Sequence, residues 1–307
     1  MRAFTLMFLV AVLVACAPQS EIPVAGFINL DDLQPLPTSE GEHVQPLRVA
    51  IAAVISPQGT AESYAPLVDY LGEKLKRPIE ILQRRTYAEI NELLRTGDVD
   101  LAFVCTSSYI LGRREFGLEL LVAPQVNGET IYRAKLIVPA ESAAQSIEDL
   151  QGKVFAFTDP NSFSGRIYPT FLLQQLNETP EDFFARTFFT YSHDDAIYAV
   201  ANGAADGASV DSLILDFVLE RDPSLVDRLR IIHTSPPFGI PPVGVRPDIN
   251  LQLRAELKAI FLGMDKTPDG LAALASIGAD RFVEVTYEDY RSAEEVETQV
   301  ISSESKP

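Results

Sequence analysis

Residues 159–166 read D-P-N-S-F-S-G-R, and this stretch decides how the chain is interpreted. It follows a short apolar run at 153–157, typical of a strand, and precedes a helical pattern at 167–176. The first N–H groups of a helix lack internal acceptors and carry partial positive charge, so this turn predicts an anion site. Ser162 and Ser164 can donate to an oxyanion or cap the helix. Taken alone, the turn is more typical of an ordinary helix cap.

Strand and helix patterns alternate along the rest of the chain. Such alternation predicts an α/β fold with mixed sheets covered by helices. The segments fit two lobes, with residues 47–138 and 238–291 in the first lobe and residues 139–237 in the second. The crossings at 138–142 and 233–237 would form a hinge that closes over a ligand. Strands are expected at 47–53, 79–82, 100–104, 118–123, 134–138, 187–190, 207–210, 229–233 and 239–245.

The N-terminus has the composition of a targeting segment. Arg2 is followed by an apolar run at 3–15, which is shorter than the roughly 20 residues of a membrane-spanning helix. The run ends in L-V-A-C and resembles a bacterial lipobox, so we expect a signal peptide at 1–15 and lipid on Cys16. A plain signal peptide with an incidental cysteine is the alternative. Lipidation would anchor the protein to the cell membrane on its extracytoplasmic side, at the cell surface or in the periplasm.

Composition sets limits on the ends of the domain and on its partners. Residues 16–46 are rich in proline and acidic residues and predict a flexible tether, and the polar residues 292–307 predict a disordered tail. The formal net charge of the 307-residue chain is -18, which argues against nucleic acid because phosphate backbones require clustered Lys and Arg. A small anion is still possible, because a pocket acts through its local donors.

Runs of sequence between residues 47 and 290 resemble, in order, the phosphate/phosphite/phosphonate-binding proteins of ABC importers. The runs are S-P-Q-G-T with Y-A-P-L-V-D-Y-L-G-E-K-L (56–75), T-Y-A-E-I with L-R-T-G-D-V-D-L-A-F (86–103), Y-R-A-K-L-I-V (132–138), 147–169 and 193–212. The resemblance implies a type II periplasmic-binding-protein fold, a small phosphorus oxyanion as ligand, and ABC permease and ATPase subunits as partners. It implies no cofactor and no metal, and we expect a monomer.

The family's ligand contacts can be placed on this sequence one by one. The matching positions are Tyr87, Tyr132, Ser162, Phe163, Ser164, Gly165, His193 and Asp211. Thr106 and Ser107, with Ser108, follow the strand at 100–104, where side chains supporting a ligand or ordinary turn residues are equally expected.

The sequence departs from the family pattern at three places. Thr86 stands where the family has an aspartate before its first tyrosine. Phe163 replaces the central threonine of the serine-rich turn, so one hydroxyl is lost and the ring either narrows the pocket or offers it an apolar wall. Leu213 stands where binders of aminoethylphosphonate have a glutamate for the ammonium group, which argues against an aminoalkyl phosphonate.

Asp211 suggests how the ligand is selected. A carboxylate only accepts hydrogen bonds, so beside an oxyanion it requires a proton on the ligand or a bridging His193. This favours protonated phosphorus oxyanions over sulfate, because an unpaired buried carboxylate beside an anion is costly.

Each candidate also has a purely structural interpretation. Tyr87 could be an exposed aromatic at a helix start, and Tyr132 could pack at the end of a strand. His193 could cap its helix, a role open to Asp194 or Asp195 as well. Asp211 could be the N-cap of the helix that begins at Ser212, a role compatible with ligand contact.

Other functions fit the sequence less well. We expect no enzyme, because the sequence lacks a G-x-S-x-G, an H-E-x-x-H, a P-loop and paired Cys/His metal spacing; a Cys105–His193 nucleophile pair is the enzymatic alternative. Tyrosines could form an aromatic box for a quaternary ammonium. A ligand sensor subunit is a further alternative. The tyrosines in question are Tyr64, Tyr87, Tyr109, Tyr132, Tyr168 and Tyr191.

Overall fold

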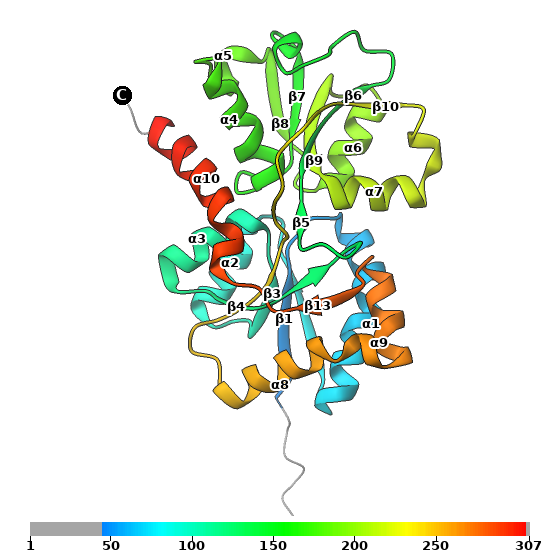
Figure 1. Ribbon diagram of the computed structural model, residues 1–307, viewed down its shortest axis with the longest axis vertical. Coiled ribbons are helices and arrows are strands. Elements are labelled where there is room, and N and C mark those ends of the chain that lie inside the picture. Colours follow the sequence, from blue (N-terminus) through cyan, green and yellow to red (C-terminus); the bar gives the residue numbers. More distant parts are fainter. Residues whose placement is uncertain (1–44, 305–307) are drawn as a thin grey trace, which may run out of the picture. The chain divides into compact units, whose positions relative to one another are not determined.

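The structure, a computed structural model, describes residues 45–304, in which two β-sheets with flanking helices form two lobes (Figure 1). The α/β class predicted from the alternating pattern is therefore confirmed. The expected signal peptide, Cys16 and nearly all of the expected tether lie outside the described residues. Within the described part of the chain, no helix is both long and apolar enough to cross a membrane.

The first lobe is built on a six-stranded sheet in the order β13-β4-β12-β3-β1-β2. β1 pairs in parallel with β2 and β3, whereas β12 runs antiparallel to β3 and β4. The strands are β1 (Leu47–Ile51), β2 (Ile79–Gln83), β3 (Leu101–Phe103), β4 (Glu119–Gln125), β12 (Val243–Val245) and β13 (Arg281–Val283). The helices are α1 (Pro57–Leu75), α2 (Tyr87–Thr96), α3 (Thr106–Phe116), α8 (Leu251–Leu262) and α9 (Pro268–Ser276).

The second lobe is built on a five-stranded sheet in the order β10-β6-β9-β7-β8. β7 pairs in parallel with β8 and β9, and β6 runs antiparallel to β9 and β10. The strands are β6 (Ala134–Pro139), β7 (Val154–Phe157), β8 (Arg186–Phe189), β9 (Gly207–Asp211) and β10 (Leu229–Thr234). A π-helical turn, η3 (Phe163–Ile167), precedes α4 (Tyr168–Gln175), and α5 (Pro180–Phe183), α6 (His193–Ala201) and α7 (Ser212–Arg221) follow.

The two connections between the lobes run side by side as a short antiparallel pair, β5 (Ile131–Tyr132) with β11 (Phe238–Gly239). Figure 1 shows β5 between the two sheets. The first crossing therefore comes earlier than predicted. Residues 134–138 were assigned to the first lobe, but β6 pairs with β9 and β10 and belongs to the second sheet. The apolar composition of this strand does not reveal which sheet it joins.

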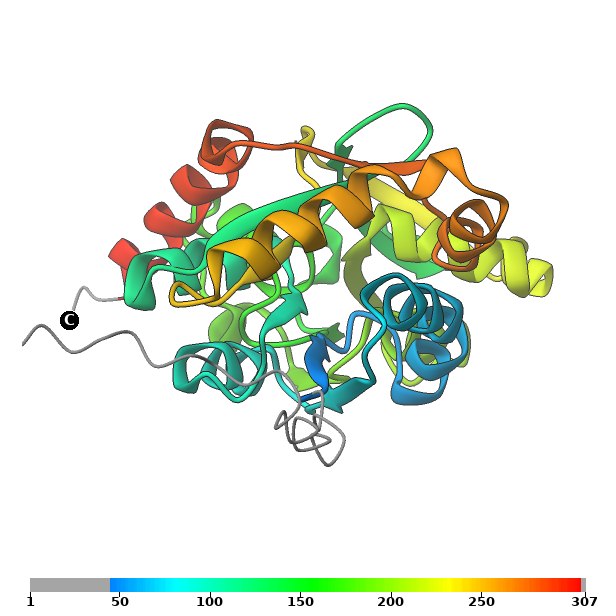
Figure 2. The ribbon, with the colours of Figure 1, turned by 90° about the horizontal axis from the view of Figure 1, so that it is seen from below.

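The C-terminal segment corrects a second prediction. Residues 292–304 were expected to be disordered, but they lie in the helix α10 (Arg291–Glu304). Ala293 and Val300 are fully buried, because this helix packs against α3 of the first lobe and against η3 and α4 of the second. Figures 1 and 2 place α10 at one end of the first lobe and α1 with α9 at the other. The sequence did not predict this helix, because its few buried apolar residues stand among many acidic ones.

An aromatic and aliphatic cluster joins the lobes beside the crossings. Tyr87, Tyr109 and Tyr290 of the first lobe share it with Phe163 and Tyr168 of the second. The Phe163 and Phe238 rings meet edge to face at 4.6 Å between centroids. Buried apolar contact thus holds the lobes together where the candidate site lies.

Candidate functional site

Most of the predicted site residues lie at the beginnings of helices that face the boundary between the lobes, and Tyr132 lies on the strand β5. Tyr87 opens α2, Thr106 opens α3, His193 opens α6, and Asp211 immediately precedes α7. Capping side chains fix these starts. Thr86 and Glu89 form a capping box on α2, so the threonine that replaces the family's aspartate has a structural role here.

Direct hydrogen bonds join the lobes around these helix starts. The backbone N–H of Tyr87 donates to the Asp159 carboxylate at 3.1 Å. The backbone N–H of His193 donates to the carbonyl of Val54 at 3.0 Å. In addition, the backbone N–H of Ser56 donates to the Asp194 carboxylate at 2.8 Å. The structure therefore has its lobes in contact, with the predicted residues enclosed between them.

The turn at residues 159–166 is tightly built. The Ser162 hydroxyl oxygen accepts the backbone N–H of Gly165 at 3.0 Å, so that N–H is used inside the turn. A Cβ at position 165 would lie 1.8 Å from Oγ1 of Thr158, which explains the glycine. Since Ser162 accepts through its oxygen, its proton is left to donate. The carbonyl of Ser164 accepts a hydrogen bond from the Ser209 hydroxyl at 2.6 Å, which fixes the backbone of Ser164.

His193 is buried and directs one polar hydrogen toward this turn. Its Nδ1 accepts the backbone N–H of Asp211 at 3.0 Å, so the ring proton resides on Nε2, 3.5 Å from Ser162 Oγ. Burial lowers the pKa of His193 to about 3, despite the opposing effect of Asp194, so the imidazole is neutral. The alternative of a helix-capping histidine is wrong, because Ser192 caps α6.

Asp211 is the N-cap of α7, as one interpretation of the sequence held. Its Oδ1 accepts the backbone N–H groups of Leu213 at 2.7 Å and Ile214 at 3.4 Å. Burial raises the pKa of the Asp211 carboxyl to about 7, although these two N–H groups oppose the rise. The carboxyl group is therefore poised to gain or lose a proton near neutral pH.

Several buried hydroxyl groups lack partners. The hydroxyls of Tyr87 and Tyr132 make no hydrogen bond of normal geometry among the described residues, and the same holds for Ser107 and Thr158. Tyr87 is fully buried, so the alternative of an exposed aromatic is wrong. Burial raises the pKa of both tyrosines well above 10, so both are neutral donors. Unpaired buried hydroxyls cost roughly 1–3 kcal/mol each, so their presence calls for an explanation.

Electrostatic influences show that these groups lie near one another. Burial is the largest cause of the raised pKa of Tyr87 and of Tyr132, and Cys105 and Asp211 both add to it. The Thr106 and Ser164 hydroxyls lower the pKa of Tyr132, so they lie close to its phenol. Thr106 itself donates to the carbonyl of Gly239 at 2.9 Å. We use the name donor cluster for Tyr87, Tyr132, Ser162, Ser164, His193 and Asp211.

Phe163 is fully buried and packs outside the cavity described next. Its ring lies against Phe238 and, at 6.5 Å between centroids, against Tyr168. The side chain thus joins the apolar contact between the lobes. Burial raises the pKa of the Cys105 thiol to about 12, although a hydrogen bond from the Phe163 backbone N–H opposes the rise. A thiol held neutral in this way does not support the enzymatic alternative with His193.

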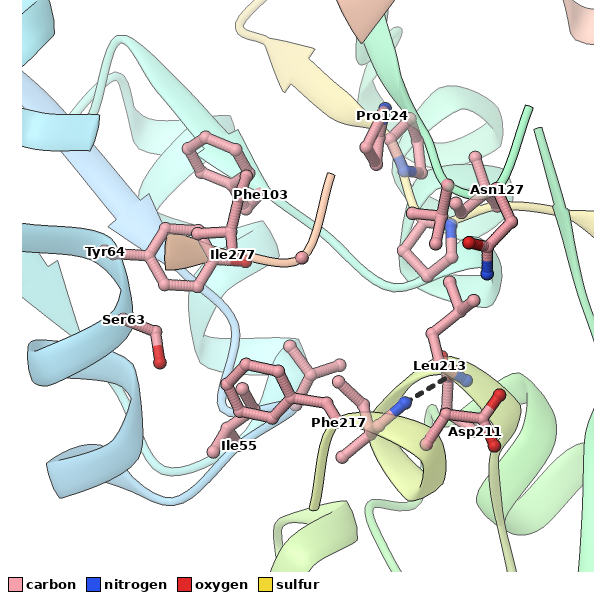
Figure 3. Close-up of a pocket in the computed structure, with 18 of the residues that line it drawn as sticks. Ile55, Ser63, Tyr64, Phe103, Pro124, Asn127, Asp211, Leu213, Phe217 and Ile277 are labelled. Carbon is pink, nitrogen blue, oxygen red and sulfur yellow. Dashed lines mark hydrogen bonds between the residues drawn. The ribbon is translucent and has the colours of Figure 1, made fainter. Parts of the chain in front are cut away.

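A cavity of about 200 Å³ lies between the lobes beside Asp211, and we call it the side chamber. Asp211 is the member of the donor cluster that lines it. Figure 3 shows Tyr64 and Phe103 of the first lobe on one side and Leu213 of α7 on the other. Sequence reasoning missed this chamber, because Tyr64 was considered only for an aromatic box.

Other candidate ligand groups are engaged elsewhere. The Arg85 guanidinium covers the Tyr191 ring at 4.1 Å, Tyr109 packs edge to face on Tyr290, and the Tyr168 hydroxyl bonds to Nε2 of His233 at 2.9 Å. These tyrosines therefore do not form a common aromatic box. No group of three or more metal-ligating side chains occurs within residues 45–304.

A family model for the periplasmic substrate-binding protein of phosphonate ABC transporters matches residues 49–290. The chain belongs to this family. A relative, the phosphonates-binding periplasmic protein of Escherichia coli (strain K12), is 26% identical over 79% of this chain and 73% of its own length. A probable ABC transporter phosphite binding protein of Prochlorococcus marinus (strain MIT 9301) is 24% identical, covering 66% of this chain and 72% of the relative.

Solved structures agree with the fold. The binding-protein component of an ABC phosphonate transporter from Pseudomonas aeruginosa superimposes with a TM-score of 0.80 at 21% identity, covering 85% of this chain and 88% of that one. The resemblance inferred from the ordered sequence runs is thus confirmed, as is the two-lobed fold. This phosphonate-transporter family consists of substrate-binding transport proteins.

Proposed function

We propose that this chain captures a small phosphorus oxyanion, such as phosphite, phosphate or an alkylphosphonate, in the donor cluster and delivers it to an ABC permease. The observation that carries the proposal is the set of unpaired buried hydroxyls around Asp211 and the neutral His193. The relatives from E. coli and Prochlorococcus marinus, named for phosphonates and phosphite, support this ligand class.

The donors suit three oxygen atoms on one phosphorus. Tyr87 and Tyr132 supply phenolic O–H groups from the first lobe and from a crossing. The hydroxyls of Ser162 and Ser164 and the Nε2–H of His193 supply donors from the second lobe. Bonds from both lobes to one ligand would favour closure, because the ligand replaces the partners that the hydroxyls lack.

Asp211 gives the site its selectivity. One proton, carried either by the ligand or by this carboxyl group, would be shared in a hydrogen bond between the two. Sulfate has no proton to offer, so once Asp211 is ionised, above its pKa of about 7, sulfate would meet the carboxylate as an unpaired like charge. We infer that the site discriminates against sulfate by this repulsion.

Calorimetric titration of the purified protein with phosphite, phosphate, methylphosphonate, sulfate and choline tests the proposal. We expect heat of binding with at least one phosphorus ligand and weaker binding of sulfate. Binding of choline with no response to any phosphorus ligand would refute the assignment.

The other expected properties belong to the same proposal. We propose that the protein is not an enzyme, works as a monomer, and has ABC permease and ATPase subunits as partners. We also propose that lipid on Cys16 anchors it to the membrane. Labelling cells with a radioactive fatty acid tests the anchor: label on the wild-type chain and none on Cys16→Ser is the expected result, and label on both would contradict it.

A further inference from the structure

The side chamber has a different chemistry from the donor cluster. Tyr64 and Phe103 meet edge to face at 5.1 Å between centroids and form one wall. Leu213 and Phe217, both on α7, line the cavity from the second lobe. Pro242 adds to the first-lobe side. The chamber is therefore a partly open cavity lined mainly by carbon, where burial of an apolar group is favourable.

Charge around the chamber excludes a second anionic group. None of the described residues that line it is a lysine, arginine or histidine. Asp216 and Glu220 line its outer part and are exposed, and Asp216 is paired with the Nζ of Lys135 at 3.0 Å. A carboxylate or a further phosphate on the ligand would meet acidic residues without a cation to balance it.

Asp211 connects the chamber to the donor cluster. It lines the chamber, and its backbone N–H donates to His193, the imidazole of the cluster. A phosphorus atom held by the cluster binds three oxygens there. Its fourth substituent must point away from these donors, and the chamber is a space that the cluster borders, through Asp211.

We propose that the ligand carries an uncharged apolar substituent of several carbons, and that the side chamber binds it. The preferred class is thus an alkyl- or arylphosphonate, or the corresponding phosphate monoester, with the phosphorus group in the donor cluster. This inference rests on the proposed function, because the donor cluster must hold the phosphorus group.

The size of the chamber supports a substituent larger than methyl. An apolar cavity of roughly 150 Å³ is enough to bind benzene. The side chamber, at about 200 Å³, has room for a phenyl or butyl group. A methyl group would leave most of it empty, and phosphite would use none of it.

Calorimetry of the purified protein with phosphite and with methyl-, ethyl-, butyl- and phenylphosphonate tests the inference. Each methylene buried should tighten binding roughly fourfold, the equivalent of about 0.8 kcal/mol. We expect butyl- and phenylphosphonate to bind more tightly than methylphosphonate. Equal or weaker binding of the larger ligands, with phosphite or methylphosphonate still bound, would overturn the chamber and leave the proposed function intact. Failure of every phosphorus ligand would overturn both.

A charge placed in the chamber sharpens the test. In Leu213→Glu, the butyl-to-methyl affinity ratio should collapse toward one, because the carboxylate opposes an apolar group. The matched control is Leu251→Glu, which makes the same change at a residue that is 78% exposed on α8, and should keep the wild-type ratio. A ratio unchanged by Leu213→Glu would contradict the proposal. So would tighter binding of 2-aminoethylphosphonate than of ethylphosphonate by the wild type.

Discussion

The two sides of Asp211 differ in what they offer a ligand. On one side, the donor cluster presents the Tyr87 and Tyr132 hydroxyls, which make no hydrogen bond of normal geometry, and a neutral imidazole. On the other, the side chamber presents aromatic and aliphatic carbon. Ligand class and ligand identity are therefore specified by separate parts of the site. Hydrogen-bond donors recognise the phosphorus group, and the shape and polarity of the chamber select what is attached to it.

Distortion of the turn at Gly165 should weaken ligand binding most, because this turn carries the serines of the donor cluster. In Gly165→Ala the new methyl group would lie 1.8 Å from Thr158 Oγ1, so the turn must shift. We expect loss of ligand binding and a loss of roughly 1–3 kcal/mol in the free energy of unfolding. Urea denaturation and calorimetry measure the two effects.

Two further variants control this experiment. The double variant Gly165→Ala/Thr158→Ala removes Oγ1 and Cγ2 of Thr158, two of the clashing atoms, and should recover part of the stability. Gly72→Ala in α1, where a Cβ would have its nearest neighbours at 3.4 Å, should fold normally and bind ligand. Full stability and binding in Gly165→Ala alone would show that the tight turn is not needed.

Removing the imidazole should weaken binding next most. His193→Ala deletes the Nε2–H donor and should cost roughly 1–3 kcal/mol of binding free energy, as for a hydrogen bond to a charged group. Asp195→Asn, an exposed change on the same helix, is the control. Calorimetry that gives equal affinities for His193→Ala and the wild type would remove His193 from the site.

The proton at Asp211 predicts a pH dependence. Because the pKa of this carboxyl is raised to about 7, it holds its proton below that pH and can share it with the ligand. Above pH 7 the carboxylate repels a fully ionised ligand, so affinity should fall by up to roughly tenfold per pH unit. Asp211→Asn, with an amide that stays neutral, should flatten this fall between pH 6.5 and 9. If the affinity of the wild type does not change over that range, the proposed shared proton is contradicted.

The same group affects the stability of the unliganded protein with a definite sign. The pKa of an aspartate is about 4 when unfolded and about 7 for Asp211 when folded, so the folded state binds the extra proton. The stability contributed by protonated Asp211 is present below pH 4 and is lost as the pH rises through 7. Melting temperatures of Asp211→Asn should therefore depend less on pH between 4 and 7 than those of the wild type.

Removal of single tyrosine hydroxyls should have the smallest effect on binding, and it distinguishes a hydroxyl that binds ligand from one that stabilises the fold. Tyr132→Phe deletes a buried hydroxyl that makes no hydrogen bond of normal geometry, so it should weaken ligand binding by roughly 1 kcal/mol and change the stability of the unliganded protein little. Tyr290→Phe is the contrasting control, because that hydroxyl donates to the Ile240 carbonyl at 3.0 Å and its loss should destabilise the protein. Destabilisation by Tyr132→Phe without any loss of affinity would assign Tyr132 a structural role.

Sequence patterns anticipated the α/β fold, because strand and helix patterns alternate along the chain, and they placed most of the polar candidates at helix starts. Three features were hidden. The start of α3 at Thr106 looked like a loop because T-S-S is also typical of turns. The strand β6 was assigned to the wrong lobe, because pairing partners are set by the tertiary fold. The chamber was missed, since an apolar side chain that lines a cavity and one that fills a core look alike in sequence.

The C-terminal helix α10 has a practical consequence. It packs on α3 of the first lobe and on η3 and α4 of the second, so any change in the angle between the lobes must slide it against one of them. Thr298 and Gln299 lie on its exposed face. A fluorescent dye attached there through an introduced cysteine would sit on a moving junction. Such a labelled protein could serve as an optical sensor whose signal follows ligand concentration without any change to the binding residues.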